Sequence, residues 1–341
     1  MSEQKITLAH GSGGQLTHDL IKHLFVRHFA NPHLSRLTDA AVLSLPDTRI
    51  ALTTDSYVIR PLFFPGGNIG KLAVCGTVND VAVMGAKPLY LTCGLIIEEQ
   101  FDYETLEQIV ASMAHTAREA GVEIVIGDTK VIERGSGDGL FINTAGIGVC
   151  YYQFPPTIEI GDKIMINGTL GDHEIAVLSA RQNLGFDVDV ASDCASLAGL
   201  IGHVLKAYSS VKFMRDPTRG GLATVLNEIV EGQPFGIALD ETDIPMKDAV
   251  RGICALLGFD PLYLANEGKV VLVVSAADAP RLLETMRAHP LGRDSRIIGE
   301  VVEAPQGLVY LRTNIGGKRV VDMPVGTQLP RSGDLTGFEN L

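Results

Sequence analysis

Apolar positions in the first half of the chain alternate between helical spacing and short runs of strand length. Apolar side chains at positions 16, 20, 21, 24, 25 and 29 share one helical face, so we predict an amphipathic helix over residues 16–29. Two aliphatic runs between residues 39 and 55 predict two strands. Further along, the pattern predicts helices over 70–84 and 102–120 and strands over 89–97, 123–126 and 140–149. Such an alternation indicates a mixed α/β domain.

A proline-containing stretch, Phe-Pro-Pro-Thr at 154–157, interrupts this alternation. Because proline ends regular structure, we place a domain boundary there. The second half predicts helices over 173–184, 194–208, 221–231, 246–257 and 278–288, and strands over 163–166, 235–239, 269–274, 296–302 and 307–311. The predicted parts are a Gly-rich segment with a helix (1–38), an N-terminal domain (39–155), a C-terminal α/β domain (156–331) and a polar tail (332–341). The predicted fold class is α+β or mixed α/β, with two domains.

The composition narrows the classes to which this protein can belong. Hydrophobic residues make up 46% of the 341 residues, enough to form cores in two domains. The net charge of −12 argues against a nucleic-acid-binding protein, which needs clustered Lys and Arg. No apolar run reaches the roughly 18 residues of a membrane span, the N-terminus has no signal-peptide pattern, and the five cysteines form no CxxC pair. We therefore expect a cytoplasmic protein with no membrane or nucleic-acid partner.

Four aspartates of the first half, Asp39, Asp55, Asp80 and Asp128, are each predicted at a strand end or beside a turn. Carboxylates gathered in one place repel each other unless a cation lies between them, and hard oxygen ligands suit Mg²⁺ carrying a polyphosphate. Aspartate is also common in helix caps and turns, so each residue alone has an ordinary structural explanation. Their grouping in one half of the chain leaves both explanations open.

Two segments of the first half have the composition of phosphate-binding loops. The sequence HGSGG at 10–14 precedes the first predicted helix, where free N–H groups and the helix dipole favour an anion; a flexible N-terminal segment is the alternative. The sequence GDTK at 127–130 directly follows a predicted strand and places a carboxylate, a hydroxyl and an ammonium at its carboxyl end. A surface hairpin is the alternative for this second segment.

The second half contains two further candidates. The segment MRDPTRGG at 214–221 leads into a predicted helix, and its Arg215, Asp216 and Arg219 suit the entrance of an anion-binding site. A capped helix with solvent-exposed arginines is the alternative. Glu267 comes just before the strand predicted over 269–274, where a partly desolvated carboxylate could act as a base. An ordinary turn glutamate explains the same pattern.

Taken in chain order, these segments resemble one protein family. The sequences HGSGG at 10–14, TDSYVIRPLFFPGGNIGKLAVCGTVNDVAVMGAKP at 54–88, GDTKVIERGSGDG at 127–139, MRDPTRGGLATVLNEI at 214–229 and LANEGKVV at 264–271 look like those of the hydrogenase maturation factors called HypE. HypE belongs to the aminoimidazole ribonucleotide synthetase-like superfamily. The resemblance extends from residue 1 to about residue 331.

The resemblance implies a homodimer whose N-terminal domains pair through an intersubunit β-barrel, with ATP and Mg²⁺ as cofactors. It also implies a reaction in which the carbamoyltransferase HypF first carbamoylates a C-terminal cysteine. HypE then dehydrates this thiocarboxamide with ATP to a thiocyanate, and the cyanide passes to the HypC–HypD complex for the iron of [NiFe] hydrogenase. The implied activity is thus that of a carbamoyl dehydratase.

The resemblance also implies roles for individual residues. It assigns Mg²⁺ to Asp55, Asp80 and Asp128, with Asp39 and Asp216 as further ligands. It implies that Lys130 stabilises the transferred phosphoryl group, that Glu267 accepts a proton, and that Arg215 and Arg219 position the tail or the phosphate. The residues implied to contact the nucleotide are His10, Gly11, Ser12, Gly13, Gly14, Lys71, Asn79, Asp80, Gly127, Asp128 and Thr129.

The end of the chain departs from the family pattern, in which Pro-Arg-Ile-Cys is the terminus and its thiol carries the substrate. Here Pro330-Arg331 is followed by SGDLTGFENL, and the last cysteine is Cys254. We therefore expect ATP binding but no carbamoyl group on this tail. The alternatives are another superfamily enzyme, such as a selenophosphate synthetase or a thiamine-monophosphate kinase, or a docking scaffold with structural ATP. A selenophosphate synthetase is disfavoured because no cysteine precedes Cys75.

Overall fold

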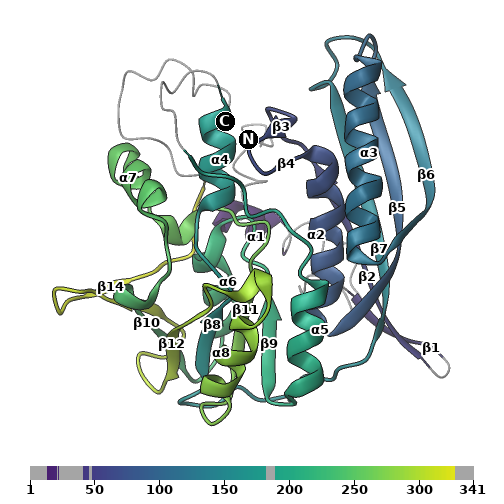
Figure 1. Ribbon diagram of the computed structural model, residues 1–341. Helices are drawn as coiled ribbons and strands as arrows, with labels where there is room; N and C mark the ends of the chain where they lie inside the picture. The colour runs from purple at the N-terminus through teal and green to yellow at the C-terminus, as the bar shows by residue number, and fades with distance from the viewer. Residues whose placement is uncertain (1–13, 21, 23–40, 46–47, 182–188, 327–341) are drawn as a thin grey trace, which may run out of the picture.

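The computed structural model describes residues 14–20, 22, 41–45, 48–181 and 189–326, which form two α/β units side by side (Figure 1). The predictions for His10, Gly11, Ser12, Gly13 and Asp39, for most of the helix over 16–29 and for the tail from 332 onwards lie outside these residues. Helix α1 (Gln15–Leu20) begins where the first helix was predicted. In the part of the chain that the structure describes, no helix has the length and apolar character needed to cross a membrane.

The N-terminal unit contains a five-stranded sheet in the order β1-β2-β7-β5-β6. Its strands are β1 (Ala41–Leu45), β2 (Thr48–Tyr57), β5 (Ala86–Glu98), β6 (Glu123–Ile132) and β7 (Leu140–Cys150). Strands β5 and β6 are parallel, and the other neighbours are antiparallel. The short strands β3 (Phe63–Phe64) and β4 (Gly67–Asn68) form a separate hairpin. The five-stranded sheet is open in a single chain, with β1 and β6 at its edges.

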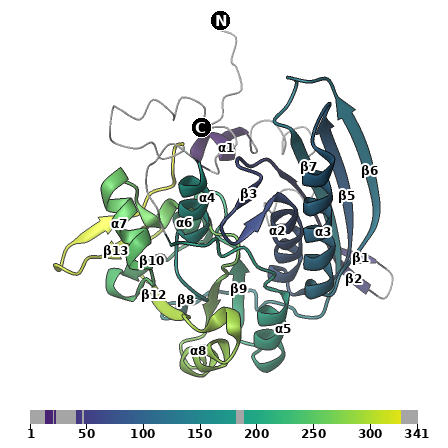
Figure 2. The same cartoon turned by 45° about the horizontal axis from the view of Figure 1, so that its top comes forward.

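Helices α2 (Ile69–Val83) and α3 (Tyr103–Ala120) cover one face of this sheet (Figures 1 and 2). Helix α2 is buried around nearly its whole circumference because its sequence is apolar on all sides. The side chain of Asn68 caps it by accepting the N–H of Lys71 at 3.0 Å. Helix α3 ends at Gly121, whose φ of 70° is the left-handed conformation of a helix C-cap.

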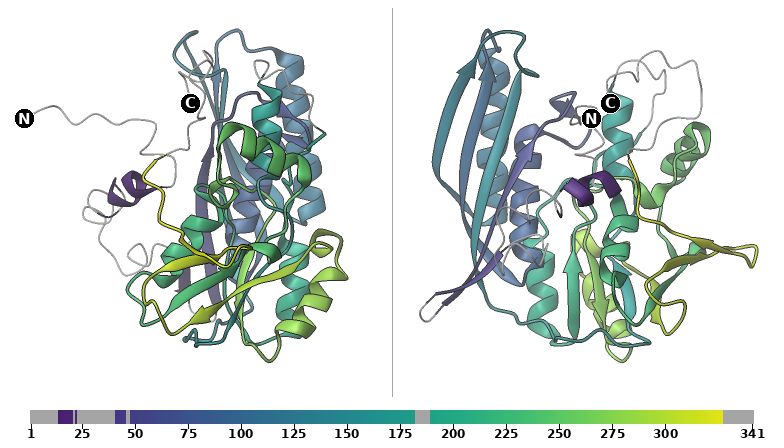
Figure 3. Two further views of the ribbon diagram at one scale, coloured as in Figure 1. Left: turned by 90° about the vertical axis from the view of Figure 1, so that its left-hand side faces the viewer. Right: turned by 180° about the vertical axis from the view of Figure 1, so that it is seen from behind.

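The opposite face of the sheet, here called the outer face, carries no described element (Figure 3). Side chains alternate between the two faces of a strand, and the register places one set of them on the outer face. Its exposed apolar members are Leu52, Tyr90, Ile96, Ile126 and Val149. A large uncovered apolar face of this kind indicates an interaction surface.

The C-terminal unit contains a seven-stranded mixed sheet in the order β14-β13-β10-β12-β8-β11-β9. Its strands are β8 (Lys163–Ile166), β9 (Val211–Arg215), β10 (Gly236–Asp240), β11 (Val271–Val274), β12 (Arg296–Val302), β13 (Val309–Arg312) and β14 (Lys318–Val320). Its helices are α4 (Asp172–Ala180), α5 (Ala198–Ala207), α6 (Gly221–Val230), α7 (Asp248–Leu257) and α8 (Ala279–Arg287). Three short 3-10 turns are Glu241–Asp243, Pro261–Tyr263 and Pro290–Gly292.

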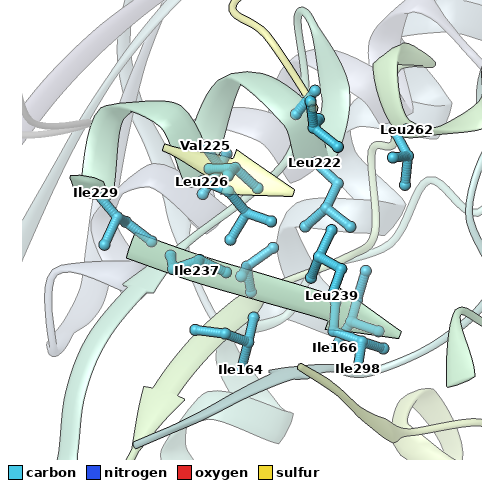
Figure 4. Packing of buried hydrophobic residues seen from close by; sticks show 14 of the residues in the cluster. Ile164, Ile166, Leu222, Val225, Leu226, Ile229, Ile237, Leu239, Leu262 and Ile298 are labelled. Atoms are coloured by element: carbon cyan, nitrogen blue, oxygen red, sulfur yellow. The ribbon is translucent and has the colours of Figure 1, made fainter. Parts of the chain in front are cut away.

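Helix α6 packs on one face of the second sheet, where Leu222 and Leu226 meet Ile166, Ile237 and Ile298 (Figure 4). Helices α5 and α8 cover its other face. The same cluster includes Ala82 and Val83 at the end of α2, so the cores of the two units are continuous between α2 and α5. This contact fixes α2, and the side chains it carries, relative to the C-terminal unit.

The pattern of apolar residues predicted most helices and strands but missed β9, β14 and the two-residue strands β3 and β4. Strand β9 overlaps the predicted anion-binding segment at residues 214 and 215, and β14 is a short edge strand whose residues are all exposed. The prediction that β6 ends at residue 126 is wrong, because β6 continues to Ile132 and residues 127–130 lie inside it. The prediction ended the strand early because glycine, here Gly127, is typical of turns. A Cβ there would lie 2.6 Å from the carbonyl oxygen of Cys93, so the glycine serves strand packing.

Candidate functional site

The carboxyl group of Glu267 lies where the two units meet, close to carboxylates from both of them. Burial raises the pKa of this carboxyl well above its ordinary value, and the negative charges of Asp216, Asp193 and Asp55 raise it further. Asp216 follows strand β9 and is 6% exposed, whereas Asp55 on β2 is partly open to solvent. The structure thus confirms that Glu267 is partly desolvated and places it beside two of the predicted metal ligands.

Asp80 belongs to the same acidic group through helix α2. Its carboxylate accepts a hydrogen bond from the Thr53 hydroxyl at 2.9 Å. Burial raises the pKa of Tyr57 well above its ordinary value, and the charges of Asp55 and Asp80 add to that effect. The expectation that Asp80 lies at a strand end is wrong, because it is inside α2. A helix and a strand therefore bring the two aspartates together.

A buried chain of hydroxyl groups holds α2 against the sheet below these carboxylates. The Tyr57 hydroxyl lies 3.1 Å from that of Thr77, which lies 2.5 Å from that of Thr144. Thr144 in turn donates to the carbonyl oxygen of Ala73 at 3.1 Å. Because β2, β7 and α2 are joined in this way, Asp55 and Asp80 are held on a rigid base.

Asp128 and Lys130 lie on the outer face of the sheet, away from this group. The register pairs Asp128 with Gly94 of β5, which pairs with Asn143 of β7, and these positions face away from the helices. They line a shallow cavity of about 320 Å³ together with Ser56 and Phe141. The predicted grouping of Asp55, Asp80 and Asp128 around one Mg²⁺ is not assembled within a single chain, because the sheet lies between Asp128 and Asp55.

The structure also tests whether the predicted carboxylates form a complete metal site. Among the residues it describes, no group of three or more His, Cys, Asp or Glu side chains is close enough to hold a metal ion. The predicted set of Asp55, Asp80, Asp128 and Asp216 is thus not assembled as a protein-only site. Mg²⁺ commonly uses only one or two carboxylates and takes its other ligands from phosphate oxygens and water. The group around Asp55, Asp80 and Asp216 fits this second arrangement.

The two predicted arginines have different surroundings. Arg219 lies in the turn before α6, is 65% exposed, and places its guanidinium 3.9 Å from the carboxylate of Asp55. Arg215 is the last residue of β9, and its guanidinium forms an ion pair with Glu228 of α6. His18 of α1 contacts the same carboxylate at 2.9 Å. Arg219 is therefore the arginine presented to the acidic group, and Arg215 joins the strand to α6.

Several residues expected to contact the nucleotide have partners inside the protein. Asn79 is 1% exposed, and its amide bonds the backbone of Ala195 and Leu197, so a direct nucleotide contact is wrong for this residue. The ammonium of Lys71 donates to the carbonyl oxygen of Gly66 at 2.8 Å. Gly14 packs against the backbone of Pro324. Thr129 and Gly127 lie within β6.

A second and larger cavity, of about 1150 Å³, opens between α2, α3 and α5. Cys75 and Cys194 lie at its wall and belong to the buried core. A hydrogen bond with Cys75, together with burial, raises the pKa of the Cys194 thiol well above its ordinary value. A thiol with a raised pKa is a poor nucleophile, which agrees with the interpretation of these cysteines as packing residues.

The polar residues that hold Glu267 in place were not predicted from the sequence. Asp193 accepts the N–H of Gly268, and Asn167 accepts the N–H of Val270. Asn266, next to Glu267, accepts the N–H of Gly171. His173 lies nearby, with Nδ1 2.8 Å from the Ser192 hydroxyl. Two of these residues could have been found from the sequence, because Asn167 precedes a glycine and Asn266 adjoins the predicted base. Asp193 and His173 have no such signal, because their partners are distant in the sequence.

Burial of His173 makes the stability of the fold depend on pH. Burial lowers its pKa from 6.5 to about 4, so the unfolded chain binds a proton more readily than the folded one between these values. Stability is therefore complete above pH 6.5 and is lost as the pH falls towards 4, by up to about 3 kcal/mol. Urea unfolding at pH 7 and pH 5 measures this loss. The His173→Gln variant should lose less stability over that interval, whereas His115→Gln, at an exposed site on α3, should behave as the parent does.

Comparison with known proteins assigns the family. Family models described as AIR synthase related protein, N-terminal domain and C-terminal domain, match residues 37–150 and 159–312. The carbamoyl dehydratase HypE of Escherichia coli is 51% identical over 334 residues, which are 96% of this chain and 98% of that protein. The carbamoyl dehydratase HypE of Cupriavidus necator is 51% identical over 335 residues, 96% of this chain and 94% of that protein.

Solved structures agree with this assignment. A HypE–HypF complex matches with a TM-score of 0.84 at 50% identity, covering 89% of this chain and 99% of that one. A HypE structure in complex with ATP matches with a TM-score of 0.79 at 47% identity, covering 95% of this chain and 99% of that one. With two matching family models and relatives of this identity along nearly its whole length, the chain belongs to the AIR synthase related family and, within it, to the HypE proteins.

Proposed function

We propose that this protein uses ATP to dehydrate a cysteine S-carboxamide to a thiocyanate, which supplies cyanide for [NiFe] hydrogenase maturation. The observation that carries the proposal is the largely buried carboxyl of Glu267, whose pKa is raised by burial and by the nearby charges of Asp55 and Asp216. Relatives about 50% identical to this chain are named carbamoyl dehydratase, and a related HypE structure contains ATP. Both findings support the proposal.

The chemistry requires an activated oxygen and a base. The amide oxygen attacks the γ-phosphorus, ADP leaves, and the nitrogen loses a proton. The C–O bond then breaks, inorganic phosphate leaves with the oxygen, and loss of the second N–H proton completes the C≡N bond. Glu267 in its ionised form accepts a proton from the nitrogen, and its raised pKa makes that carboxylate a stronger base than an ordinary one.

The acidic group accounts for the use of Mg²⁺ with ATP. Asp55, Asp80 and Asp216 offer hard oxygen donors from a strand, a helix and a loop, and their mutual repulsion favours a cation. When bound, Mg²⁺ supplies positive charge that offsets the charge of the triphosphate. Arg219, 3.9 Å from Asp55, adds a cation at the open side of the group.

A homodimer completes the site. The outer face is apolar and uncovered, and Asp128 and Lys130 lie on it, away from the acidic group of their own chain. Two copies that pair through this face close their open sheets into an intersubunit β-barrel and bring Lys130 of each copy towards the triphosphate of the other. The N-terminal domain (39–155) then serves ATP binding and dimerisation, and the C-terminal domain (156–331) supplies Glu267.

The partners follow from the reaction. A carbamoyltransferase of the HypF type must supply the carboxamide, and the related HypE–HypF complex supports that pairing. A HypC–HypD complex receives the cyanide. The five free cysteines agree with a reducing compartment, so we place the protein in the cytoplasm.

A single-turnover assay tests the proposed reaction. Residues 332–341 are replaced by Ile-Cys, the ending of the resembled family, and the new thiol is carbamoylated with a HypF-type enzyme. On addition of ATP and Mg²⁺, mass spectrometry should show loss of one water per tail, with one ADP and one phosphate formed for each thiocyanate. Retention of the carboxamide with ATP bound would instead indicate a scaffold, and phosphate transfer to a small alcohol would indicate a kinase.

A further inference from the structure

The side chain of Asp193 holds the backbone of Glu267, the proposed base. One of its carboxylate oxygens accepts the N–H of Glu267 at 3.2 Å, and the other accepts the N–H of Gly268 at 3.1 Å. The ammonium of Lys269 donates to this second oxygen at 2.9 Å. The side chains of Asp193 and Lys269 are only 3% and 9% exposed, so solvent does not weaken these bonds.

Asn79 holds the same peptide segment from the opposite side. Its Nδ2 donates to the carbonyl oxygens of Glu267 at 3.4 Å and Ala195 at 3.0 Å, while its Oδ1 accepts the N–H of Leu197 at 2.7 Å. Asn79 adjoins Asp80 in α2. Its hydrogen bond to Glu267 therefore links the Glu267 segment to the helix of the N-terminal unit that contains Asp80. Both the N–H and the carbonyl of Glu267 are therefore fixed by side chains.

The packing leaves Glu267 little freedom to move. A Cβ on Gly268 would lie 1.9 Å from the carbonyl oxygen of Asp193, so the two backbones are in contact. On the other side, the N–H and the Nδ2 of Asn266 both donate to the carbonyl oxygen of Pro217 at 3.1 Å. That second contact fixes Glu267 relative to Asp216, the residue before Pro217.

We propose that Asp193 is a positioning residue for the dehydration, which aims the Glu267 carboxyl at the nitrogen of the carboxamide. The inference rests on the proposed function, because it assumes that Glu267 is the base. Lys269 supports Asp193 by balancing its charge, since a buried carboxylate without a cation is unfavourable. Neither residue contacts the reacting atoms, so both act through Glu267, whose backbone they hold in place.

The chain offers a matched control for a purely structural role. Asp162 and Lys212 form another buried ion pair in the same unit, with N–O distance 2.9 Å and side chains 4% and 8% exposed. Asp162 also accepts a backbone N–H, that of Glu159, at 2.7 Å. This pair joins the segment before β8 to β9 and does not contact residues 266–268. Loss of either pair should destabilise the fold, but only loss of the first should slow the reaction.

The test measures the single-turnover rate and its ATP dependence in the tail-replaced chain. Asp193→Asn should lower the rate about ten- to hundredfold, the effect expected of a slightly misplaced base, while the ATP concentration at half-maximal rate stays unchanged. Asp162→Asn should retain the parent rate. The double variant Asp193→Asn/Lys269→Met removes the unpaired ammonium and should recover thermal stability without recovering the rate.

Each result decides between the explanations. Recovery of the rate in the double variant, or an equal loss in Asp162→Asn, would show that Asp193 is merely structural. Glu267→Gln in the same series separates this inference from the proposed function. If Glu267→Gln remains active, the assigned base is wrong. If it is inactive while Asp193→Asn reacts at the parent rate, the base stands and the positioning role is refuted.

Discussion

Replacing Glu267 by glutamine is expected to slow thiocyanate formation by about 10² to 10⁴-fold, the range that a general base contributes. Glutamine keeps the size and hydrogen-bonding geometry of the side chain but cannot accept the proton. ATP should still bind, because Asp55, Asp80 and Arg219 are unchanged. The parent rate should rise with pH through the raised pKa of Glu267, since the base must be unprotonated, and the variant should lose that rise.

The control for this variant is Glu174→Gln. Burial also raises the pKa of Glu174, and its carboxylate accepts the N–H of Ala265 at 2.6 Å, only two residues from Glu267. A glutamine at 174 can still accept that hydrogen bond, so the turnover should stay near that of the parent. Single-turnover mass spectrometry at several pH values compares the two variants. A Glu267→Gln protein with the parent rate would remove Glu267 from the mechanism.

The sequence predicted the elements better than it predicted how the elements meet. The apolar pattern identified α3 and most strands because each of these buries a periodic face, and it identified α2 as a helix that is apolar on all sides. The predicted end of β6 was wrong because Gly127 and Asp128 are of types common in turns. In the structure they continue an exposed edge strand to Ile132. Edge strands such as β14 bury little, so their sequences contain little periodic signal.

For the site, the types of residue were predictable and their grouping was not. Asp55, Asp80, Asp216 and Glu267 were singled out, and the structure brings them together from a strand, a helix and two loops. Asp128 was added to the same group because spacing cannot show which face of a sheet a residue occupies once the strand boundary is wrong. The family resemblance implied a nucleotide contact for Asn79, although a polar residue inside an apolar helix also has a structural explanation. Its buried amide, bonded to Ala195 and Leu197, decides for the structural one.

Asp55→Asn and Lys130→Met are each expected to slow thiocyanate formation by about 10² to 10³-fold, the effect of removing one electrostatic contact to the transferred group. The two residues face opposite sides of the sheet, so the proposed dimer places them in one site only across subunits. A heterodimer of the two variants then has one intact site and one doubly defective site. Purified with two different affinity tags, it should convert about half as many tails as the parent, at the parent rate.

The reciprocal heterodimer provides the control, because the two arrangements predict opposite results for it. When one chain carries both substitutions and the other carries neither, every composite site lacks one essential group, so the heterodimer should be inactive. If each site were built from a single chain, this heterodimer would keep one intact site, and the heterodimer of the two single variants would be inactive. Measuring the amplitude of thiocyanate formation in both heterodimers therefore determines whether Lys130 acts on its own subunit or across the outer face, since no change in stability can invert the order of the two amplitudes.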